Sequence, residues 1–139
     1  MREALKEARK AFEKDEVPVG AVIVANDRII ARAFNLTETL NDVTAHAEMQ
    51  AITAAASYIG GKYLKECTLF VTLEPCLMCA GALYWAQIAR IVYGASDLKR
   101  GFTLSPSSPL HPATTMTGNI LAMDCAGLLS DFFKKKRKL

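Results

Sequence analysis

The sequence predicts an α/β fold in which helices cover the faces of a sheet. Runs of β-branched and aromatic residues alternate with segments whose apolar residues recur at helical spacing, and this alternation is typical of an α/β sandwich. A chain of 139 residues is long enough to bury a proper core. Because no repeat or linker divides the chain, we expect a single domain over residues 1–139.

The first predicted elements are a helix and a hairpin. The helix is expected to end near Lys14, because Pro18 disfavours helical backbone in the residue before it. Residues 19–34 contain two β-rich runs on either side of Asn26 and Asp27, a pair that favours a tight turn. These residues are therefore predicted to form two adjacent strands.

A second helix is predicted for the segment AHAEMQAITAAASYI, which is followed by Gly60 and Gly61. Glycine commonly ends a helix because it adopts the left-handed conformation without strain. The apolar face of this helix is expected to consist of Met49, Ile52, Ala56 and Ile59.

The middle of the chain predicts a strand, a helix and another strand. TLFVTL at 68–73 is a short apolar run with the composition of a buried strand. Pro75 suits the first turn of a helix that is expected to run from about Pro75 to Ala86. RIVYGA at 90–95 predicts the next strand.

The last third of the chain predicts a long loop and a final helix. Residues 96–118 are rich in Ser, Pro and Thr, with room for a short strand at 114–117. Asn119 is a suitable N-cap for the final helix. The apolar residues of this helix are Leu121, Leu128, Leu129, Phe132 and Phe133.

The positive charge of the chain lies in its C-terminal tail. The net charge is +3, and without the five cations of KKKRK at 134–138 it would be −2. A solvated end and a contact with phosphates both fit such a run. The first sixteen residues mix five basic and five acidic side chains, unlike a signal peptide, and no apolar run is long enough to span a bilayer. We therefore expect a cytoplasmic protein without a membrane segment.

Three residues are candidate ligands of one metal ion. Cys76 and Cys79 are three residues apart, so in a helix their side chains lie on one face. His46 precedes them by one helix and one strand, and a helix-strand-helix unit can bring two helix starts to the same edge of a sheet. One imidazole and two thiolates leave a tetrahedral zinc ion one open position, which is typical of a catalytic site and normally holds water.

Glu48 is the candidate proton carrier. It follows His46 by two residues, and in a first helical turn both side chains can reach an atom beyond the helix end. A carboxylate in that place can take a proton from the zinc water and pass it to a ring nitrogen, and later to a departing amine.

Other interpretations of the cysteines remain open from the residues alone. A CxxC pair is also found in thioredoxin-type redox sites and in half of a structural zinc site. A structural zinc domain that binds nucleic acid through the tail would leave Glu48 without a role. Cys67 and Cys125 are expected to be buried apolar residues, and His111 a loop residue rather than a ligand.

The pairing of HAE at 46–48 with PCLMC at 75–79 resembles the signature of the zinc-dependent cytidine and deoxycytidylate deaminase superfamily. EVPVGAV at 16–22, TLEPCLMCAGAL at 72–83 and GNILAMDCAGLLSDFFKKKRK at 118–138 resemble segments of bacterial tRNA-specific adenosine deaminases.

This resemblance implies a cytidine deaminase-like fold, a three-layer α/β/α sandwich with a central mixed sheet of five strands. It implies a zinc-dependent aminohydrolase that converts adenosine to inosine at the tRNA wobble position, with His46, Cys76 and Cys79 as zinc ligands and Glu48 as the catalytic residue. It further implies one zinc ion per subunit with a bound water or hydroxide, contact of Asn35 with the base, and a homodimer that binds the anticodon stem-loop.

Two segments of the sequence also fit a different substrate. GALYWA at 81–86 resembles a helix of guanine deaminases, which act on the free base, and DLKRGFTL at 97–104 differs from the small residues common in the tRNA enzymes. A free nucleobase or nucleoside is therefore the second hypothesis, with guanine first and cytosine or cytidine next. The basic tail favours RNA, because a neutral purine offers no phosphates to bind.

Overall fold

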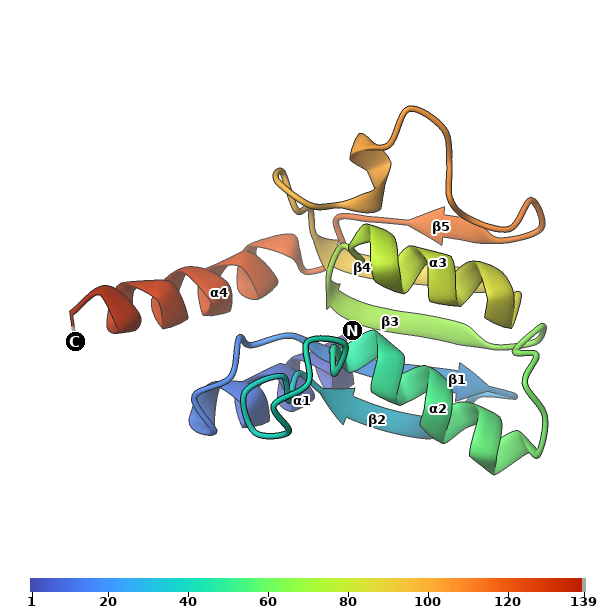
Figure 1. Ribbon diagram of the computed structural model, residues 1–139, viewed down its shortest axis with the longest axis horizontal. Helices are drawn as coiled ribbons and strands as arrows, with labels where there is room; N and C mark the ends of the chain where they lie inside the picture. The colour runs from blue at the N-terminus through green and yellow to red at the C-terminus, as the bar shows by residue number, and fades with distance from the viewer. Residues whose placement is uncertain (139) are drawn as a thin grey trace.

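A computed structural model describes residues 1–138 as a three-layer α/β/α sandwich around one mixed sheet (Figure 1). The strand order is β2-β1-β3-β4-β5. The strands are β1 (Gly20–Ala25), β2 (Arg28–Phe34), β3 (Thr68–Leu73), β4 (Arg90–Ala95) and β5 (Thr115–Thr117). The helices are α1 (Arg2–Glu13), α2 (Ala47–Ile59), α3 (Leu77–Ala86), α4 (Ala122–Arg137) and the 3-10 turn η1 (Phe102–Leu104). The predicted fold class is confirmed.

The helices divide into two layers. Helices α2 and α3 cover one face of the sheet and contact each other, whereas α1 and α4 lie against the other face (Figure 1). Within residues 1–138, no helix combines the length and the apolar character needed to cross a membrane.

The directions of the strands determine where the loops meet. β1 runs antiparallel to both β2 and β3, and β4 is parallel to β3 and to β5. Asn26 and Asp27, which join β1 to β2, both have positive φ, as a tight hairpin turn requires. Strands β2, β3 and β4 therefore end at the same edge of the sheet, and the segments that follow them are neighbours there.

The buried face of α2 differs from the predicted face. Ala47, Ala51 and Ala55 have no exposed surface and pack against the sheet, whereas Ile59 is 46% exposed. The sequence analysis placed the larger apolar side chains of α2 on the buried face. The small side chains of alanine instead let the helix lie close to the sheet, so the larger side chains lie beside the helix–sheet contact and not within it.

The two C-terminal helices begin later than predicted. Cys76 is the N-cap of α3, and Pro75 lies fully buried before it. Asn119 does not cap α4, because its N–H donates to the carbonyl of Gly94 and continues the pairing along β4. The helix starts only after Leu121, which like Asn119 has positive φ.

Candidate active site

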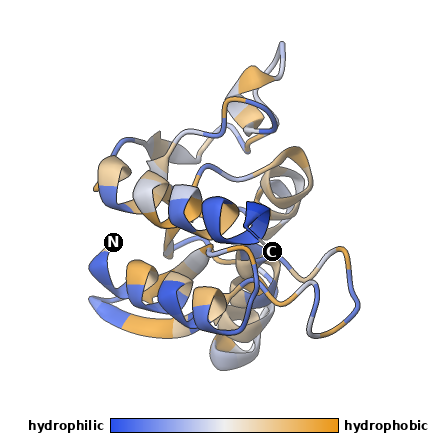
Figure 2. Ribbon diagram, turned by 90° about the vertical axis from the view of Figure 1, so that its left-hand side faces the viewer, coloured by the Kyte–Doolittle hydropathy of each residue, from blue (hydrophilic) through white to orange (hydrophobic). Residues whose placement is uncertain are grey.

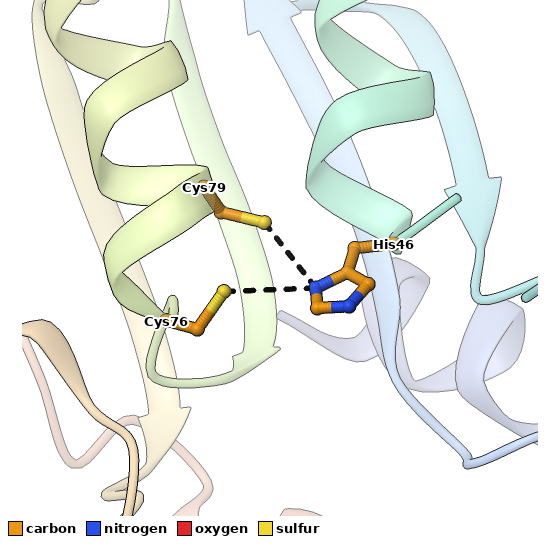
Figure 3. A group of neighbouring side chains, drawn as sticks. All are labelled: His46, Cys76 and Cys79. Atoms are coloured by element: carbon orange, nitrogen blue, oxygen red, sulfur yellow. Dashed lines mark hydrogen bonds between the residues drawn. The ribbon is translucent and has the colours of Figure 1, made fainter. Parts of the chain in front are cut away.

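The three candidate ligands meet in one cluster between the starts of α2 and α3 (Figure 3). Nδ1 of His46 lies 3.7 Å from Sγ of Cys76 and 3.5 Å from Sγ of Cys79. The ligand atoms all lie within 4.8 Å of one another. The sequence prediction that these side chains converge is confirmed, although 30 and 33 residues separate the histidine from the cysteines.

The positions of these residues follow from the local backbone. His46 and Cys76 are the N-cap residues of α2 and α3, and both have extended φ and ψ. An N-cap side chain projects beyond the first turn of its helix, so the two side chains point into the space between the helix ends. Cys79 lies one turn into α3 and turns its fully buried thiol toward the same point.

The donor set fits a zinc ion. Zinc binds thiolate at about 2.3 Å and imidazole at about 2.0–2.1 Å, so a tetrahedral arrangement places these donor atoms about 3.6 Å apart. The two separations between His46 and the cysteines, 3.5 and 3.7 Å, agree with that value. Three protein donors also leave one position of a tetrahedron open.

The two cysteines of the cluster differ in acidity. The pKa of Cys76 is lowered to about 4, because its thiolate accepts a hydrogen bond from Cys79 and lies beside His46. The same hydrogen bond raises the pKa of Cys79, and burial raises it further. Contact with Cys76 raises the pKa of His46. Cys76 is therefore the thiolate of the pair and Cys79 the thiol.

Glu48 lies beside this cluster in the first turn of α2. Its side chain is 4% exposed, and burial raises its pKa to about 7. A carboxyl group with a pKa near neutrality can both accept and release a proton at physiological pH.

His46, Glu48 and Cys76 line one cavity of about 210 Å³ at the edge where β2, β3 and β4 end. Asn35, which is 6% exposed, lines it too, and its Nδ2 donates to Oγ1 of Thr37 at 3.5 Å. The remaining lining residues are Val17, Val19, Thr37, Ala47, Leu73, Glu74, Asp97 and Arg100. All but Thr37 lie in segments that the sequence analysis quoted, but none was given a role in the site, because they come from five segments that only the fold brings together.

The other residues considered as ligands lie elsewhere. Cys67 and Cys125 are each 1% exposed and belong to two separate apolar clusters, so the prediction that they are core residues is confirmed. His111 lies in the loop before β5, where its Nδ1 accepts a hydrogen bond from the N–H of Ala113. Among the described residues, His46, Cys76 and Cys79 form the only group that could hold a metal ion.

The unusual residues of the 97–104 loop point in two directions. Phe102 is 3% exposed and packs edge-on against Tyr93. Thr103 donates both its N–H and its hydroxyl to the buried carboxylate of Glu74. Leu104 is exposed. Of the three changed residues, therefore, only Phe102 is buried, while Thr103 is exposed but bonds a buried carboxylate.

The basic tail is the end of α4. The last four helical residues, Lys134 to Arg137, are exposed cations. Lys136 forms an ion pair with Asp15, and Nζ of Lys135 lies 5.4 Å from the ring centre of Phe12. In Figure 1, α4 extends beyond the edge of the sheet at which α2 and α3 begin, and Figure 2 shows its hydrophilic end from that side.

Sequence comparison establishes the family. A model of the cytidine and deoxycytidylate deaminase zinc-binding region matches residues 1–95, which include His46, Cys76 and Cys79. The tRNA-specific adenosine deaminase of Bacillus subtilis is 47% identical over 144 residues, covering 99% of this chain and 89% of the relative. The chain belongs to the cytidine and deoxycytidylate deaminase family. The cluster of His46, Cys76 and Cys79 lies within the part of the chain that this zinc-binding region matches.

Two solved deaminase structures resemble this member of the family. One comes from structural studies of A-to-I editing by tRNA:A34 deaminases at the wobble position of transfer RNA; it aligns with a TM-score of 0.87 and 44% identity, covering 92% of this chain and 96% of the other. The guanine deaminase of Bacillus subtilis aligns with a TM-score of 0.65 and 40% identity, covering 68% of this chain and 61% of the other.

Proposed function

We propose that this deaminase hydrolyses the wobble adenosine of a tRNA anticodon to inosine and releases ammonia. The observation that carries the proposal is that Glu48 lines one small cavity with His46 and Cys76, whose donor atoms cluster with that of Cys79. The relatives named for tRNA adenosine deamination match the chain over nearly its whole length, and they indicate the substrate.

His46, through Nδ1, and the sulfurs of Cys76 and Cys79 would hold one zinc ion per subunit. Zinc bound by these residues would supply an acidified water, or hydroxide, as the nucleophile at neutral pH. Burial keeps bulk water away from Cys79 and from Glu48, so the charges in the site act through a medium of low polarity.

Glu48 would move the protons of the reaction. It would take a proton from the attacking water and deliver it to N1 of adenine, which makes C6 more electrophilic. It would then transfer the second proton of the water to the amino group on C6, which leaves as ammonia. Its buried position beside the cluster suits both steps, because one group that stays at the reacting atoms must be a base first and an acid afterwards.

Asn35 would orient the base. Its amide lies in the wall of the cavity and offers both a donor and an acceptor for the edge of a purine. The contact with Thr37 holds the side chain in the wall.

The similarity to guanine deaminase supports the second hypothesis, a free-base substrate, because the same zinc ligands and the same glutamate would serve both reactions. The tRNA substrate is favoured by the tail. The exposed cations at the end of α4 extend beyond the edge of the sheet at which β2, β3 and β4 end, and residues at that edge line the cavity, so RNA phosphates would pass near both. A tRNA substrate also agrees with the expected cytoplasmic location.

We further infer that residues 1–139 act as one deaminase domain and that the protein forms a homodimer. The support for the dimer is α3, which carries large apolar side chains on its surface. These are Leu77 (60% exposed), Met78 (38%), Tyr84 (38%) and Trp85 (76%). Exposed apolar side chains gathered in this way are typical of protein interfaces.

The decisive experiment measures ammonia release from four substrates under the same conditions. These are an anticodon stem-loop with adenosine at the wobble position, guanine, cytosine and free adenosine. We expect turnover of the stem-loop, and conversion of its adenosine to inosine can be read by mass spectrometry. Turnover of guanine without turnover of the stem-loop would overturn the proposal in favour of the second hypothesis.

A further inference from the structure

Two buried glutamates outside the zinc cluster each hold one loop beside the cavity. Glu16 has no exposed surface, and Glu74 is 2% exposed. A buried carboxylate is unfavourable unless hydrogen bonds replace the water that it loses. Neither residue ligates the metal cluster, so their burial calls for a separate explanation.

The carboxylates make the same set of hydrogen bonds to two different loops. Oε1 of Glu16 accepts from the N–H of Glu38 at 3.1 Å, and its Oε2 accepts from the N–H and the hydroxyl of Thr39, both at 2.6 Å. Oε1 of Glu74 accepts from the N–H of Asp97 at 3.1 Å, and its Oε2 accepts from the N–H and the hydroxyl of Thr103 at 2.9 and 2.7 Å.

These loops form the two sides of the cavity. The loop held by Glu16 follows β2, and it carries Thr37, which lines the cavity beside Asn35. The loop held by Glu74 follows β4, and Asp97 and Arg100 of this loop line the cavity. In the sheet order, β2 and β4 stand on either side of the pair β1 and β3, so the loops lie on opposite sides of the site.

The loop held by Glu74 is also tied to the metal cluster. Gly101 pairs with Cys76 in an isolated antiparallel bridge, and the N–H of Phe102 donates to the carbonyl of Pro75 at 2.9 Å. The backbone of Gly101 passes so close that an added Cβ would lie 2.2 Å from Oε2 of Glu74. Glu74 therefore lies between one cavity wall and the segment that presents the first zinc sulfur.

We propose that Glu16 and Glu74 are a matched pair of positioning residues, which hold the two walls of the cavity at the separation that the substrate base requires. The proposal rests on the proposed function for the identity of that base. Neither residue takes part in proton transfer. Each carboxylate accepts hydrogen bonds from backbone N–H groups of a loop, and these groups have no partner in a sheet or a helix. Loss of either carboxylate should therefore make one wall of the cavity mobile.

The test compares Glu16→Gln and Glu74→Gln with Glu7→Gln. Glu7 is the matched control, because it is buried like the other two but bonds only Lys10, within α1. Glutamine keeps the shape of the side chain and places an N–H₂ group against a backbone N–H. We expect KM for the stem-loop to rise about tenfold in both loop variants, with zinc content and kcat near those of the wild type and no change in KM for Glu7→Gln.

Hydrogen exchange gives a second readout that does not need a substrate. The amides of Asp97 and Thr103 should lose protection in Glu74→Gln alone, and those of Glu38 and Thr39 in Glu16→Gln alone. A global loss of protection in a glutamine variant would indicate that the variant unfolds. In that case Thr103→Val and Thr103→Ser are compared in its place. Valine removes the hydroxyl donor and should raise KM, whereas serine keeps it and should preserve KM.

The outcomes separate this proposal from the proposed function. Unchanged exchange in the two loops, or faster exchange with wild-type KM, would overturn the positioning role. If the wild-type enzyme does not deaminate the stem-loop but does deaminate a free purine, the proposed function fails. The positioning role of Glu16 and Glu74 is then tested by measuring KM for that purine in their glutamine variants, together with the same hydrogen-exchange measurements.

Discussion

Sγ of Cys79 lies 3.5 Å from Nδ1 of His46, although the two residues are 33 positions apart and belong to different helices. This separation matches two donor atoms on one tetrahedral zinc ion. The starts of α2 and α3 lie side by side at one edge of the sheet (Figure 3). The sheet therefore brings together donor atoms that are far apart in the sequence.

Zinc removal is predicted to lower the thermal stability of the enzyme. A ligand that binds only the folded state stabilises it by RT ln(1 + [L]/Kd), about 4 kcal/mol at a thousandfold excess over Kd. Chelation should therefore lower Tm in the wild type, as measured by differential scanning calorimetry. Cys76→Ala should bind little zinc, so chelation should leave its Tm nearly unchanged. An equal shift in both proteins would place the metal elsewhere.

Glu48→Gln is predicted to keep zinc and to lose activity. The amide preserves the shape of the side chain but cannot carry the protons, so we expect kcat to fall by about 10²- to 10⁴-fold. Zinc content is measured by mass spectrometry and activity by ammonia release. His46→Ala is the comparison, since it should lose both zinc and activity. Near-native turnover in Glu48→Gln would remove this residue from the mechanism.

Cys76 is predicted to be the most reactive cysteine of the metal-free protein. Its pKa is lowered to about 4 by the hydrogen bond from Cys79 and by His46, so at pH 6 it is a thiolate, the form that reacts with iodoacetamide. Burial raises the pKa values of Cys67 and Cys125, which remain thiols at that pH.

Peptide mass spectrometry after labelling at pH 6 measures this selectivity. The label should appear on Cys76 first, its rate should fall only when the pH approaches 4, and zinc should protect the residue. Labelling of all four cysteines at similar rates, or with a midpoint near the ordinary thiol pKa, would contradict the assignment of the thiolate.

Gly101→Ala is predicted to destabilise the protein. The new methyl group would lie 2.2 Å from Oε2 and 2.3 Å from Cδ of Glu74, so the loop would have to shift, and we expect unfolding to become easier by about 1–3 kcal/mol. Gly81→Ala is the matched control. Nothing lies within 4 Å of its added Cβ, and alanine in a helix interior should stabilise by roughly 0.5–1 kcal/mol. Urea unfolding of both variants measures the free energy of unfolding, which should fall in Gly101→Ala and rise in Gly81→Ala.

The tail is predicted to bind RNA phosphates. Replacing Lys134, Arg137 and Lys138 by glutamine leaves the interactions of Lys135 with Phe12 and of Lys136 with Asp15 in place. Affinity for the stem-loop should fall, and the slope of log K against log salt should decrease by about one for each phosphate that the tail no longer neutralises.

The control for the tail replaces three cations at the opposite end of the sheet, where β2 and β3 begin. These residues are Arg28, which is the first residue of β2, and Lys62 and Lys65, which precede β3. Their replacement should leave affinity and salt dependence close to the wild type. If the tail variant also binds as the wild type does, the run of cations is only a solvated helix end.

The local sequence determined the positions of several strands and the residue types of the candidate site. Strands 68–73 and 90–95 were predicted at their observed bounds, because short β-branched runs between turns have one good solution in a buried sheet. The convergence of His46, Cys76 and Cys79 was predicted because zinc chemistry needs these residue types at two helix starts, a spacing that short motifs contain. Asn119 was misassigned as a helix cap, because its N–H pairs with a residue of β4 that is distant in sequence.

Tertiary structure decided what lies around those residues. The buried face of α2 consists of alanines, because close approach to the sheet mattered more than side-chain size. Trp85 is exposed and Phe102 is buried, which neither residue type nor spacing could determine. Glu16 and Glu74 acquire their partners only when β2 and β4 end at the same edge of the sheet. Burial of a carboxylate depends on donors from distant segments, and these come together only in the folded chain.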